Sequence, residues 1–290
     1  MSNAGKHIDP NQEFEKQTDN FFSKVQVPFK ASKEDIWDEL EAKLDFTKTV
    51  LPARKINYRW TFAIAATVLL LVAVFSLFRF YTTTIECPAG QHLTANLPDG
   101  STVQLNASST LSYKPLWWQF SRTLSFEGEG FFDVQKGEKF TVKSSIASTT
   151  VLGTSFNIYA RDDRYEVSCH SGKVKVRSKN NEEGILSPGY EAKLSLDGKV
   201  VIYKSQENKS SISWIDNKFI FTAIPLRRVF EEIERQYDVQ ITIPEGITHS
   251  YTGYFTKDKS PEAVLGLVCK PFGLTFVANS GNSFTVIRNE

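Results

Sequence analysis

At 290 residues the chain exceeds the average length of one domain, so we expect about two folded domains. Its net charge of +1 gives no basis for nucleic-acid binding, and we expect no nucleic-acid partner. Three cysteines (Cys87, Cys169 and Cys269) lack the spacing of a metal site, and the four histidines show no ligand spacing. We therefore expect no metal and no cofactor, while one disulfide and three buried thiols both stay open.

Residues 1–58 predict a short helical tail. Apolar residues with helical spacing lie at positions 14, 21, 22 and 25, and Pro28 ends this first helix. A second helix begins after Ser32, which is expected to cap it together with Asp35. The apolar side chains of this helix lie along one face: Ile36, Trp37, Leu40 and Leu44. Two such helices bury too little surface to form a core, so the tail either merely solvates the next segment or binds a partner.

Residues 59–81 are predicted to form one transmembrane helix. From Thr61 to Phe78 the stretch has no charge, proline or glycine, and as a helix it spans roughly 27 Å, close to the ~30 Å hydrocarbon core of a bilayer. A buried core helix of this length usually keeps a polar stripe, which this stretch lacks. A signal peptide lies at the N-terminus and ends in a small-residue cleavage site, whereas this stretch begins near residue 59 and has no such site after it. Basic residues precede the stretch at positions 48, 54, 55 and 59, whereas Arg79 alone follows it before Lys114. The positive-inside rule therefore places the tail in the cytoplasm and the remaining chain across the membrane.

Residues 82–205 alternate between apolar and polar positions in short runs, which is typical of β-strands. Turn-forming pairs separate many of these runs, at Asp99-Gly100, Asp162-Asp163, Ser171-Gly172, Pro188-Gly189 and Asp197-Gly198. Short strands at even spacing predict an all-β domain, either a sandwich or a roll.

Two features of this region could indicate catalysis. Glu127 and Glu129 are two residues apart, and paired carboxylates can act as acid and base. However, Gly128 and Gly130 favour a turn or bulge in which both acids are solvated. The sequence GTSFN at residues 153–157 matches a nucleophile elbow only in part, because the last glycine is missing. We therefore do not expect an enzyme.

Residues 212–290 change to a mixed pattern. A strand at 218–224 precedes a helix opened by Pro225, whose apolar face contains Leu226, Val229, Phe230, Ile233 and Tyr237. Strands at 239–243 and 251–256 follow, then a helix from Pro261 to Val268, then strands at 274–278 and 283–287. The order βαββαβ, with one further strand, predicts a small α/β domain with both helices on one sheet face.

Six blocks between residues 82 and 200 resemble the FecR family, whose members are membrane-anchored anti-sigma factors of Gram-negative bacteria. The blocks are LPDGSTVQLNASSTLSY, RTLSFEGEGFFDV, KFTVKSS, VLGTSFNIYA, SGKVKV and LSPGYEA. The chain has GEGFF at 128–132 where the family usually has alanine third, a change that affects only backbone freedom. Residues 212–290 resemble the domain often appended to FecR-like proteins, which is similar in plan to the short signalling domain of secretins and TonB-dependent transducers.

This resemblance implies a signal relay across the inner membrane. The tail is expected to hold an extracytoplasmic-function sigma factor, with Ile36, Trp37, Leu40 and Leu44 as contacts. The periplasmic domains are expected to contact the signalling domain of a TonB-dependent outer-membrane transducer, after which an intramembrane protease would cut the chain. For docking by strand addition the candidate is residues 250–256, with Tyr251, Tyr254 and Phe255, although a covered or central strand is equally compatible with this segment.

Two other classes stay open from the residues alone. One is a membrane-tethered periplasmic module that binds a glycan or a peptide, for which the tail would be dispensable. The other is a membrane-tethered enzyme, which would need convergent titratable residues that the sequence does not supply.

Overall fold

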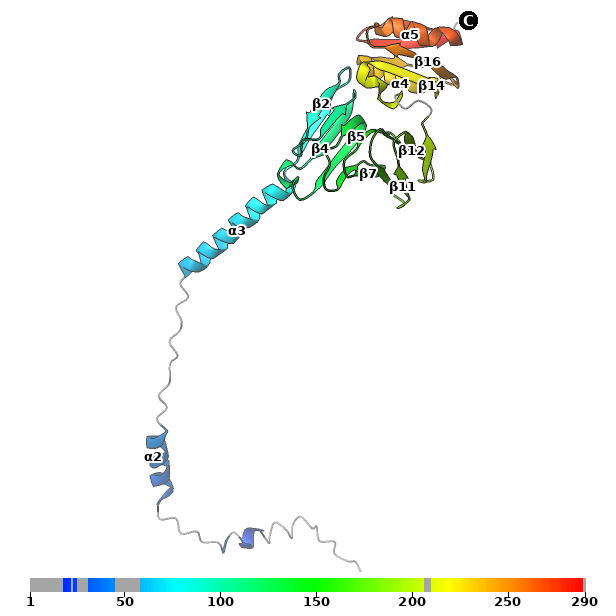
Figure 1. The fold of residues 1–290 in the computed structure, drawn as a ribbon. Coiled ribbons are helices and arrows are strands. Elements are labelled where there is room, and N and C mark those ends of the chain that lie inside the picture. Colours follow the sequence, from blue (N-terminus) through cyan, green and yellow to red (C-terminus); the bar gives the residue numbers. More distant parts are fainter. Residues whose placement is uncertain (1–17, 22, 25–30, 45–57, 206–209, 289–290) are drawn as a thin grey trace, which may run out of the picture. The chain divides into compact units, whose positions relative to one another are not determined.

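The computed structural model describes residues 18–21, 23–24, 31–44, 58–205 and 210–288 (Figure 1). The chain divides into two units, Met1–Phe62 and Ala63–Glu290. The helix expected at 14–25 lies mostly outside the described residues. Within that range residues 18–21 are described as helical. The second predicted helix is α2 (Lys33–Lys43), and its capping box is confirmed. The backbone N–H of Asp35 donates to Oγ of Ser32 over 3.2 Å, and the N–H of Ser32 donates to the Asp35 carboxylate over 3.0 Å.

The apolar stretch forms α3 (Tyr58–Phe80), the one helix among the described residues that is long and apolar enough to cross a membrane. Its 23 residues correspond to about 35 Å of helix. None of these residues is buried, whereas the core helix of a soluble domain would bury most of its residues. α3 is therefore compatible with a single membrane crossing.

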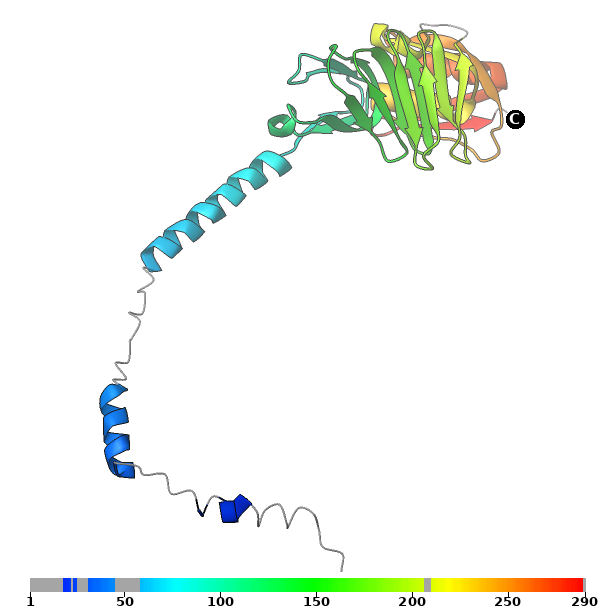
Figure 2. The ribbon, with the colours of Figure 1, turned by 60° about the horizontal axis from the view of Figure 1, so that its bottom comes forward.

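A large, mostly β region follows α3, as predicted, and we call residues 83–204 the β-lobe. All five predicted turn pairs lie between consecutive strands. Its strands lie side by side in the green part of Figure 2. The elements are β1 (Thr83–Cys87), β2 (Leu93–Asn96), β3 (Thr102–Leu105), β4 (Ser109–Tyr113), η1 (Pro115–Trp117), β5 (Arg122–Asp133), β6 (Phe140–Lys143), β7 (Ala147–Val151), β8 (Ser155–Arg161), β9 (Arg164–Cys169), β10 (Val174–Ser178), β11 (Glu183–Leu186), β12 (Tyr190–Leu194) and β13 (Val200–Lys204).

The strand β5 organises the β-lobe because it pairs with four others. Its first half pairs with β4 and β6, and its second half, from Gly128 onward, pairs with β3 and β8. Gly128 marks the change of neighbours: its φ is +120°, and a Cβ there would lie 2.6 Å from Cα of Ser109. The predicted turn with both acids solvated is therefore wrong, because the strand continues and only Glu127 is exposed, whereas Glu129 is half-buried.

The core of the β-lobe consists of large side chains from alternate strand positions, such as Leu105, Leu111, Phe126, Phe140, Ile158 and Tyr165. Phe132 stacks on Phe156 with ring centroids 5.1 Å apart. Cys87 and Cys169 are buried in this core, and Cys269 is buried in the next. All three are free thiols, so of the two alternatives, one disulfide or three buried thiols, the structure has three buried thiols.

Residues 210–288 form the second lobe, which we call the C-terminal lobe, and its elements have the predicted order. They are η2 (Ser210–Asp216), β14 (Lys218–Pro225), α4 (Leu226–Tyr237), β15 (Gln240–Thr242), β16 (Ser250–Thr256), α5 (Pro261–Cys269), η3 (Lys270–Phe272), β17 (Leu274–Asn279) and β18 (Ser283–Arg288). The strands form two small sheets, β14–β16 and β15–β18–β17, where we expected one. They separate because the short β15 pairs in parallel with β18, which leaves β16 with β14.

Candidate functional site

The helix α2 presents an apolar face that nothing in its own unit covers among the described residues. Its members Ile36, Trp37, Leu40 and Leu44 are all exposed, and Trp37 is 62% exposed. At about 100° per residue these four side chains fall within roughly a third of the helix circumference. No residue of α2 is buried, so this face contributes nothing to a core among the described residues.

The three residues singled out on β16 divide between its two faces. Tyr251 and Phe255 are buried, and Phe255 stacks on Phe219 of the paired strand at 5.1 Å. Tyr254 points the other way and is 65% exposed. β16 pairs with β14 on one edge, and no strand pairs with its other edge among the described residues. Strand addition at β16 would therefore use that edge and Tyr254, with Tyr251 and Phe255 as structural supports.

A buried polar network joins the two lobes, and the sequence did not reveal it. We call it the interlobe network; its members are His92, Asn106, Glu129 and Asn157 from the β-lobe and Trp214, Glu232 and Gln236 from the C-terminal lobe. It lies where α4 faces the β-lobe (Figure 1). Gln236 lies at its centre, because its Nε2 donates to Asn106 over 2.7 Å and to Glu232 over 2.8 Å, while its Oε1 lies 3.1 Å from Nε2 of His92.

The network continues from Asn106 to Glu129 and back to the C-terminal lobe. Nδ2 of Asn106 donates to the Glu129 carboxylate over 2.8 Å, and Nδ2 of Asn157 donates to its other oxygen over 3.1 Å. The indole N–H of Trp214 then donates to Oδ1 of Asn157 over 3.3 Å. Each amide side chain thus uses both its donor and its acceptor. This condition favours one position of the two lobes relative to each other.

Glu129 has a pKa well above the usual value of a glutamate. Burial, and then the neighbouring Glu232 carboxylate, raises its pKa to about 7, although Arg161 and the two asparagines act in the opposite direction. In Glu232 burial is outweighed by Arg235 and Arg161, so the pKa of that carboxyl stays below its usual value. Glu129 can therefore change its protonation state near neutral pH, whereas Glu232 stays ionised.

Two arginines supply the positive charge around these acids. Arg235 donates to the Glu232 carboxylate over 2.7 Å within α4. Arg161 instead donates to backbone carbonyls of its own lobe, at Ala107 over 2.6 Å and at Ser108 over 2.7 Å. A backbone hydrogen bond also crosses between the lobes, because the N–H of Gly90 donates to the carbonyl of Arg235 over 2.8 Å. Removing one charge here would leave another buried and unpaired, which is costly.

Sequence reasoning missed this network because its residues look like ordinary solvated positions. Glu232, Arg235 and Gln236 lie on the polar side of an amphipathic helix, where charged side chains normally face water. Only the packing of α4 on the β-lobe buries Glu232 and Gln236 and leaves Arg235 half-buried. The one local signal was the four-residue spacing of Glu232 and Gln236, which places both on the same helix face about one turn apart, but it does not distinguish a buried pair from an exposed pair.

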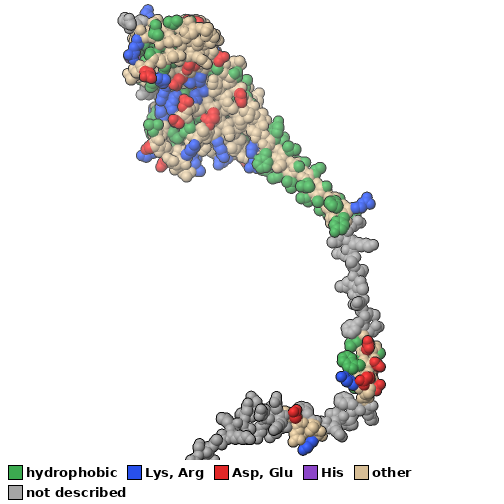
Figure 3. Space-filling view, turned by 180° about the vertical axis from the view of Figure 1, so that it is seen from behind, with side chains coloured by type: hydrophobic (Ala, Val, Ile, Leu, Met, Phe, Trp, Pro, Cys, Tyr) green, Lys and Arg blue, Asp and Glu red, His purple; other side chains and the backbone are tan. Residues whose placement is uncertain are grey.

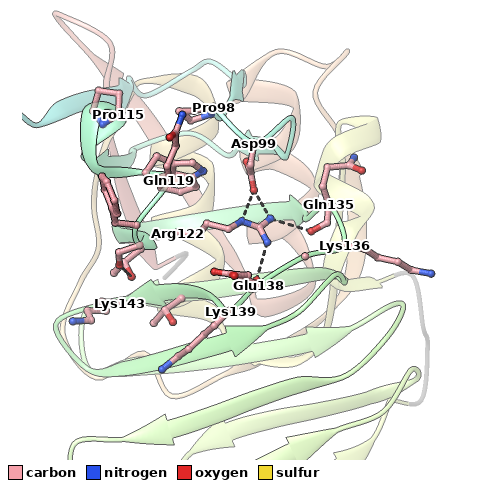
Figure 4. A pocket seen from close by; sticks show the side chains of 16 residues that line it. Pro98, Asp99, Pro115, Gln119, Arg122, Gln135, Lys136, Glu138, Lys139 and Lys143 are labelled. Atoms are coloured by element: carbon pink, nitrogen blue, oxygen red, sulfur yellow. Dashed lines mark hydrogen bonds and ion pairs between the residues drawn. The ribbon is translucent and has the colours of Figure 1, made fainter.

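A cavity of about 620 Å³ lies on the β-lobe beside Arg122 (Figure 4). The Arg122 guanidinium is already occupied: it donates to Asp99 over 2.7 Å, to the carbonyl of Glu138 over 2.8 Å and to that of Gln135 over 2.9 Å. The lysines of the cavity lie on its rim, at positions 136, 139 and 143. Arg122 therefore ties the cavity walls together and is not a free recognition group.

Comparisons with known proteins agree with this architecture. Residues 83–175 match the model of the FecR protein family, and residues 218–286 match the model described as FecR, C-terminal. The two segments together cover more than half of the chain. No curated protein gives a significant match.

Two solved structures have the same fold over most of the second unit. Both are described as a "putative anti-sigma factor" from Parabacteroides distasonis, at 2.50 Å and 1.65 Å resolution. They are similar to this chain with TM-scores of 0.66 and 0.65 at 26% sequence identity. Each match covers 72% of this chain and 100% of the solved chain.

Proposed function

This chain belongs to the FecR family, and from that premise we propose that it is a membrane-anchored anti-sigma factor. In this proposal α3 crosses the inner membrane once, the tail of residues 1–58 lies in the cytoplasm, and the β-lobe (part of a domain of residues 82–205) and the C-terminal domain of residues 212–290 lie in the periplasm. The tail holds an extracytoplasmic-function sigma factor and so keeps it from RNA polymerase.

The observation that carries the proposal is the uncovered apolar face of α2, in a chain whose family includes anti-sigma factors. A capped helix with Trp37 and its leucine and isoleucine neighbours on one side has the form of a helix that binds in a groove. Burial of these four side chains against a sigma factor would supply the apolar contact that the tail lacks by itself.

The test uses residues 1–58 as bait for sigma factors from the source bacterium, identified by mass spectrometry. We expect capture of an extracytoplasmic-function sigma factor, and loss of capture with Trp37→Ala combined with Leu40→Ala. Asp38→Ala, on the opposite side of α2, is the matched control and should leave capture unchanged. Failure of the wild-type tail to bind any sigma factor in the purified mixture would contradict the proposal.

The periplasmic part would receive the signal from a TonB-dependent outer-membrane transducer. The free edge of β16 and the exposed Tyr254 support docking of an extended segment of the transducer's signalling domain. To bias the relay tenfold, such docking must favour one state of the chain by about 1.4 kcal/mol. The interlobe network is a candidate for the element with two states, because it couples β5 to α4.

Cleavage is the favoured output of the relay. Between Thr61 and Phe78 α3 has no charged side chain to hold it against a partner helix, so it is a poor rigid lever. We propose that transducer contact exposes the chain to an intramembrane protease, which frees the sigma factor. The test is a variant whose cleavage is blocked: it should stay silent with inducer, and a normal response from it would refute the cleavage step.

A further inference from the structure

The loop after β4 carries apolar side chains that the β-lobe does not bury. Leu116 and Phe120 are exposed, Phe120 by 72%, and Trp117 lies between them. Trp117 stacks at a tilt on Phe120, with ring centroids 4.7 Å apart. We call Leu116, Trp117 and Phe120 the aromatic rim. Its neighbour Trp118 is buried and packs on Tyr113 and Phe140, which fixes the loop to the lobe.

The aromatic rim contacts the last turns of α3. The ring of Trp117 meets that of Phe75 edge to face at 6.0 Å, and the Arg79 guanidinium lies 5.2 Å from the Trp117 ring centroid. Phe75 lies three residues before Phe78, the last residue of the uncharged stretch, which is about 4.5 Å along the helix axis. If α3 spans a bilayer, Trp117 therefore lies at the depth of the boundary between acyl chains and headgroups.

Basic side chains surround a cavity of about 380 Å³ next to this contact. Arg79, Lys114 and Lys143 line it together with several hydroxyl side chains, and its lining contains no acidic residue within the described part of the chain. Lys114 lies 5.5 Å from the ring centroid of Phe80, the last residue of α3. In Figure 3 the hydrophobic surface of the helix continues onto the adjoining edge of the lobe, where Lys and Arg side chains gather.

We propose that the aromatic rim and these cations form a membrane-docking surface that holds the β-lobe against the periplasmic leaflet. Trp117 and Phe120 enter the headgroup region, and Arg79, Lys114 and Lys143 face the phosphates of anionic phospholipids. The occupant is the lipid surface, because the contact with Phe75 places the rim beside the proposed crossing. The inference rests on that crossing, and it adds a second attachment that restricts the orientation of both lobes.

The test measures the depth of single spin labels in the full chain, reconstituted in nanodiscs of phosphatidylethanolamine and phosphatidylglycerol. The engineered thiols are Phe120→Cys on the rim, Leu71→Cys within α3 and Leu267→Cys on α5, which lies at the far end of the second unit in Figures 1 and 2. The three native thiols are buried and burial raises their pKa, so they react slowly with the label, and the unmodified chain measures this background.

Accessibility to oxygen relative to a water-soluble nickel complex reports the depth of each label. We expect the ratio at position 120 to exceed that at position 267 several times over, and the ratio at position 71 to be higher still. Equal ratios at 120 and 267, with a high ratio at 71, would overturn the docking surface while leaving the crossing intact. A low ratio at 71 would overturn the crossing itself and, with it, the docking surface.

A second comparison tests the cations. Lys114→Gln with Lys143→Gln should lower the ratio at position 120, because the lipid phosphates lose two positive partners. The matched control is Lys259→Gln with Lys270→Gln on the C-terminal lobe, which should change nothing. An unchanged ratio in the first variant would overturn the assignment of these lysines to lipid phosphate.

Discussion

The side-chain amide of Gln236 donates from Nε2 to Oδ1 of Asn106 over 2.7 Å, and this hydrogen bond links α4 of the C-terminal lobe to the loop after β3 of the β-lobe. Both residues are fully buried. Buried amides without partners are unfavourable, so this contact favours one relative position of the lobes over all others. A relay that passes through both lobes has to keep or break this link.

Gln236→Ala should loosen the contact between the lobes. It removes the hydrogen bond to the His92 ring and one of the two hydrogen bonds to Oδ1 of Asn106, which keeps the N–H of Ala107, and we expect a loss of about 1–3 kcal/mol in the free energy of unfolding. Thermal unfolding of the full chain in detergent, followed by calorimetry, measures this loss. The control is Gln240→Ala, an exposed glutamine on β15. Equal effects of the two substitutions would show that the network does not hold the lobes.

Glu129 should make the stability of the second unit depend on pH. Its pKa is raised from 4.5 to about 7 in the folded chain, mainly by burial. The folded state therefore keeps a proton that the unfolded state loses, so this contribution is fully present below about pH 4.5 and is lost as the pH rises through about 7. The full effect is of the order of 3 kcal/mol.

Glu129→Gln removes this titration. Compared with the wild type, its melting temperature should fall less between pH 5 and about pH 8. The matched variant is Glu127→Gln, since Glu127 lies on the same strand but is exposed. A wild-type chain with the same pH profile as Glu129→Gln would contradict the raised pKa.

The sequence was sufficient where local pattern decides the structure. The spacing of Leu226, Val229, Phe230 and Ile233 predicted α4 because a helix with a 3.6-residue period buries such a face wherever it packs. The turn pairs of the β-lobe were found because left-handed or tight backbone conformations require particular residues, as at Gly100 with φ +81°.

The sequence was insufficient where the structure depends on which face of a strand or helix packs against another part of the chain. Strand alternation places Tyr254 on one face and Tyr251 and Phe255 on the other, but it does not show which of the two faces meets the core. In the same way, Glu129 has the same local pattern as Glu127, and it is half-buried, whereas Glu127 is exposed, because side chains of the C-terminal lobe lie next to its end of β5. Such burial depends on contacts between residues more than 100 positions apart, which no local pattern records.

Gly128→Ala and Gly266→Ala should change the free energy of unfolding in opposite directions. A Cβ at Gly128 would lie 2.6 Å from Cα of Ser109, at a φ of +120°, so we expect a loss of roughly 2–4 kcal/mol. Gly266 lies within α5, and a Cβ added there would meet no atom within 4 Å, so alanine should stabilise the helix by up to about 1 kcal/mol. Chemical denaturation of the two variants measures both. A neutral Gly128→Ala would show that β5 does not need this conformation to change partners.

Tyr254 and Phe255 should separate docking from stability. Phe255→Ala removes a ring that is 1% exposed, and we expect a loss of about 3–5 kcal/mol. Tyr254→Ala should leave the melting temperature within about 2 °C of the wild type, since its effect on the free energy of unfolding is expected within about ±0.5 kcal/mol. If strand addition at β16 receives the signal, Tyr254→Ala should weaken binding of the transducer's signalling domain, measured by titration calorimetry. Unchanged binding would remove β16 as the docking edge.

Ser32 should control sigma-factor binding through the helix that it caps. Ser32→Ala removes the acceptor for the N–H of Asp35, which costs about 1 kcal/mol of helix stability and so weakens binding by about fivefold, because the tail must form α2 when it binds. Ser32→Asn keeps a capping oxygen and should restore both. The measurements are the helical circular dichroism of the tail and its affinity for the sigma factor found by capture. Reduced helicity with unchanged affinity would mean that the sigma factor does not recognise Trp37 and its neighbours on a helix.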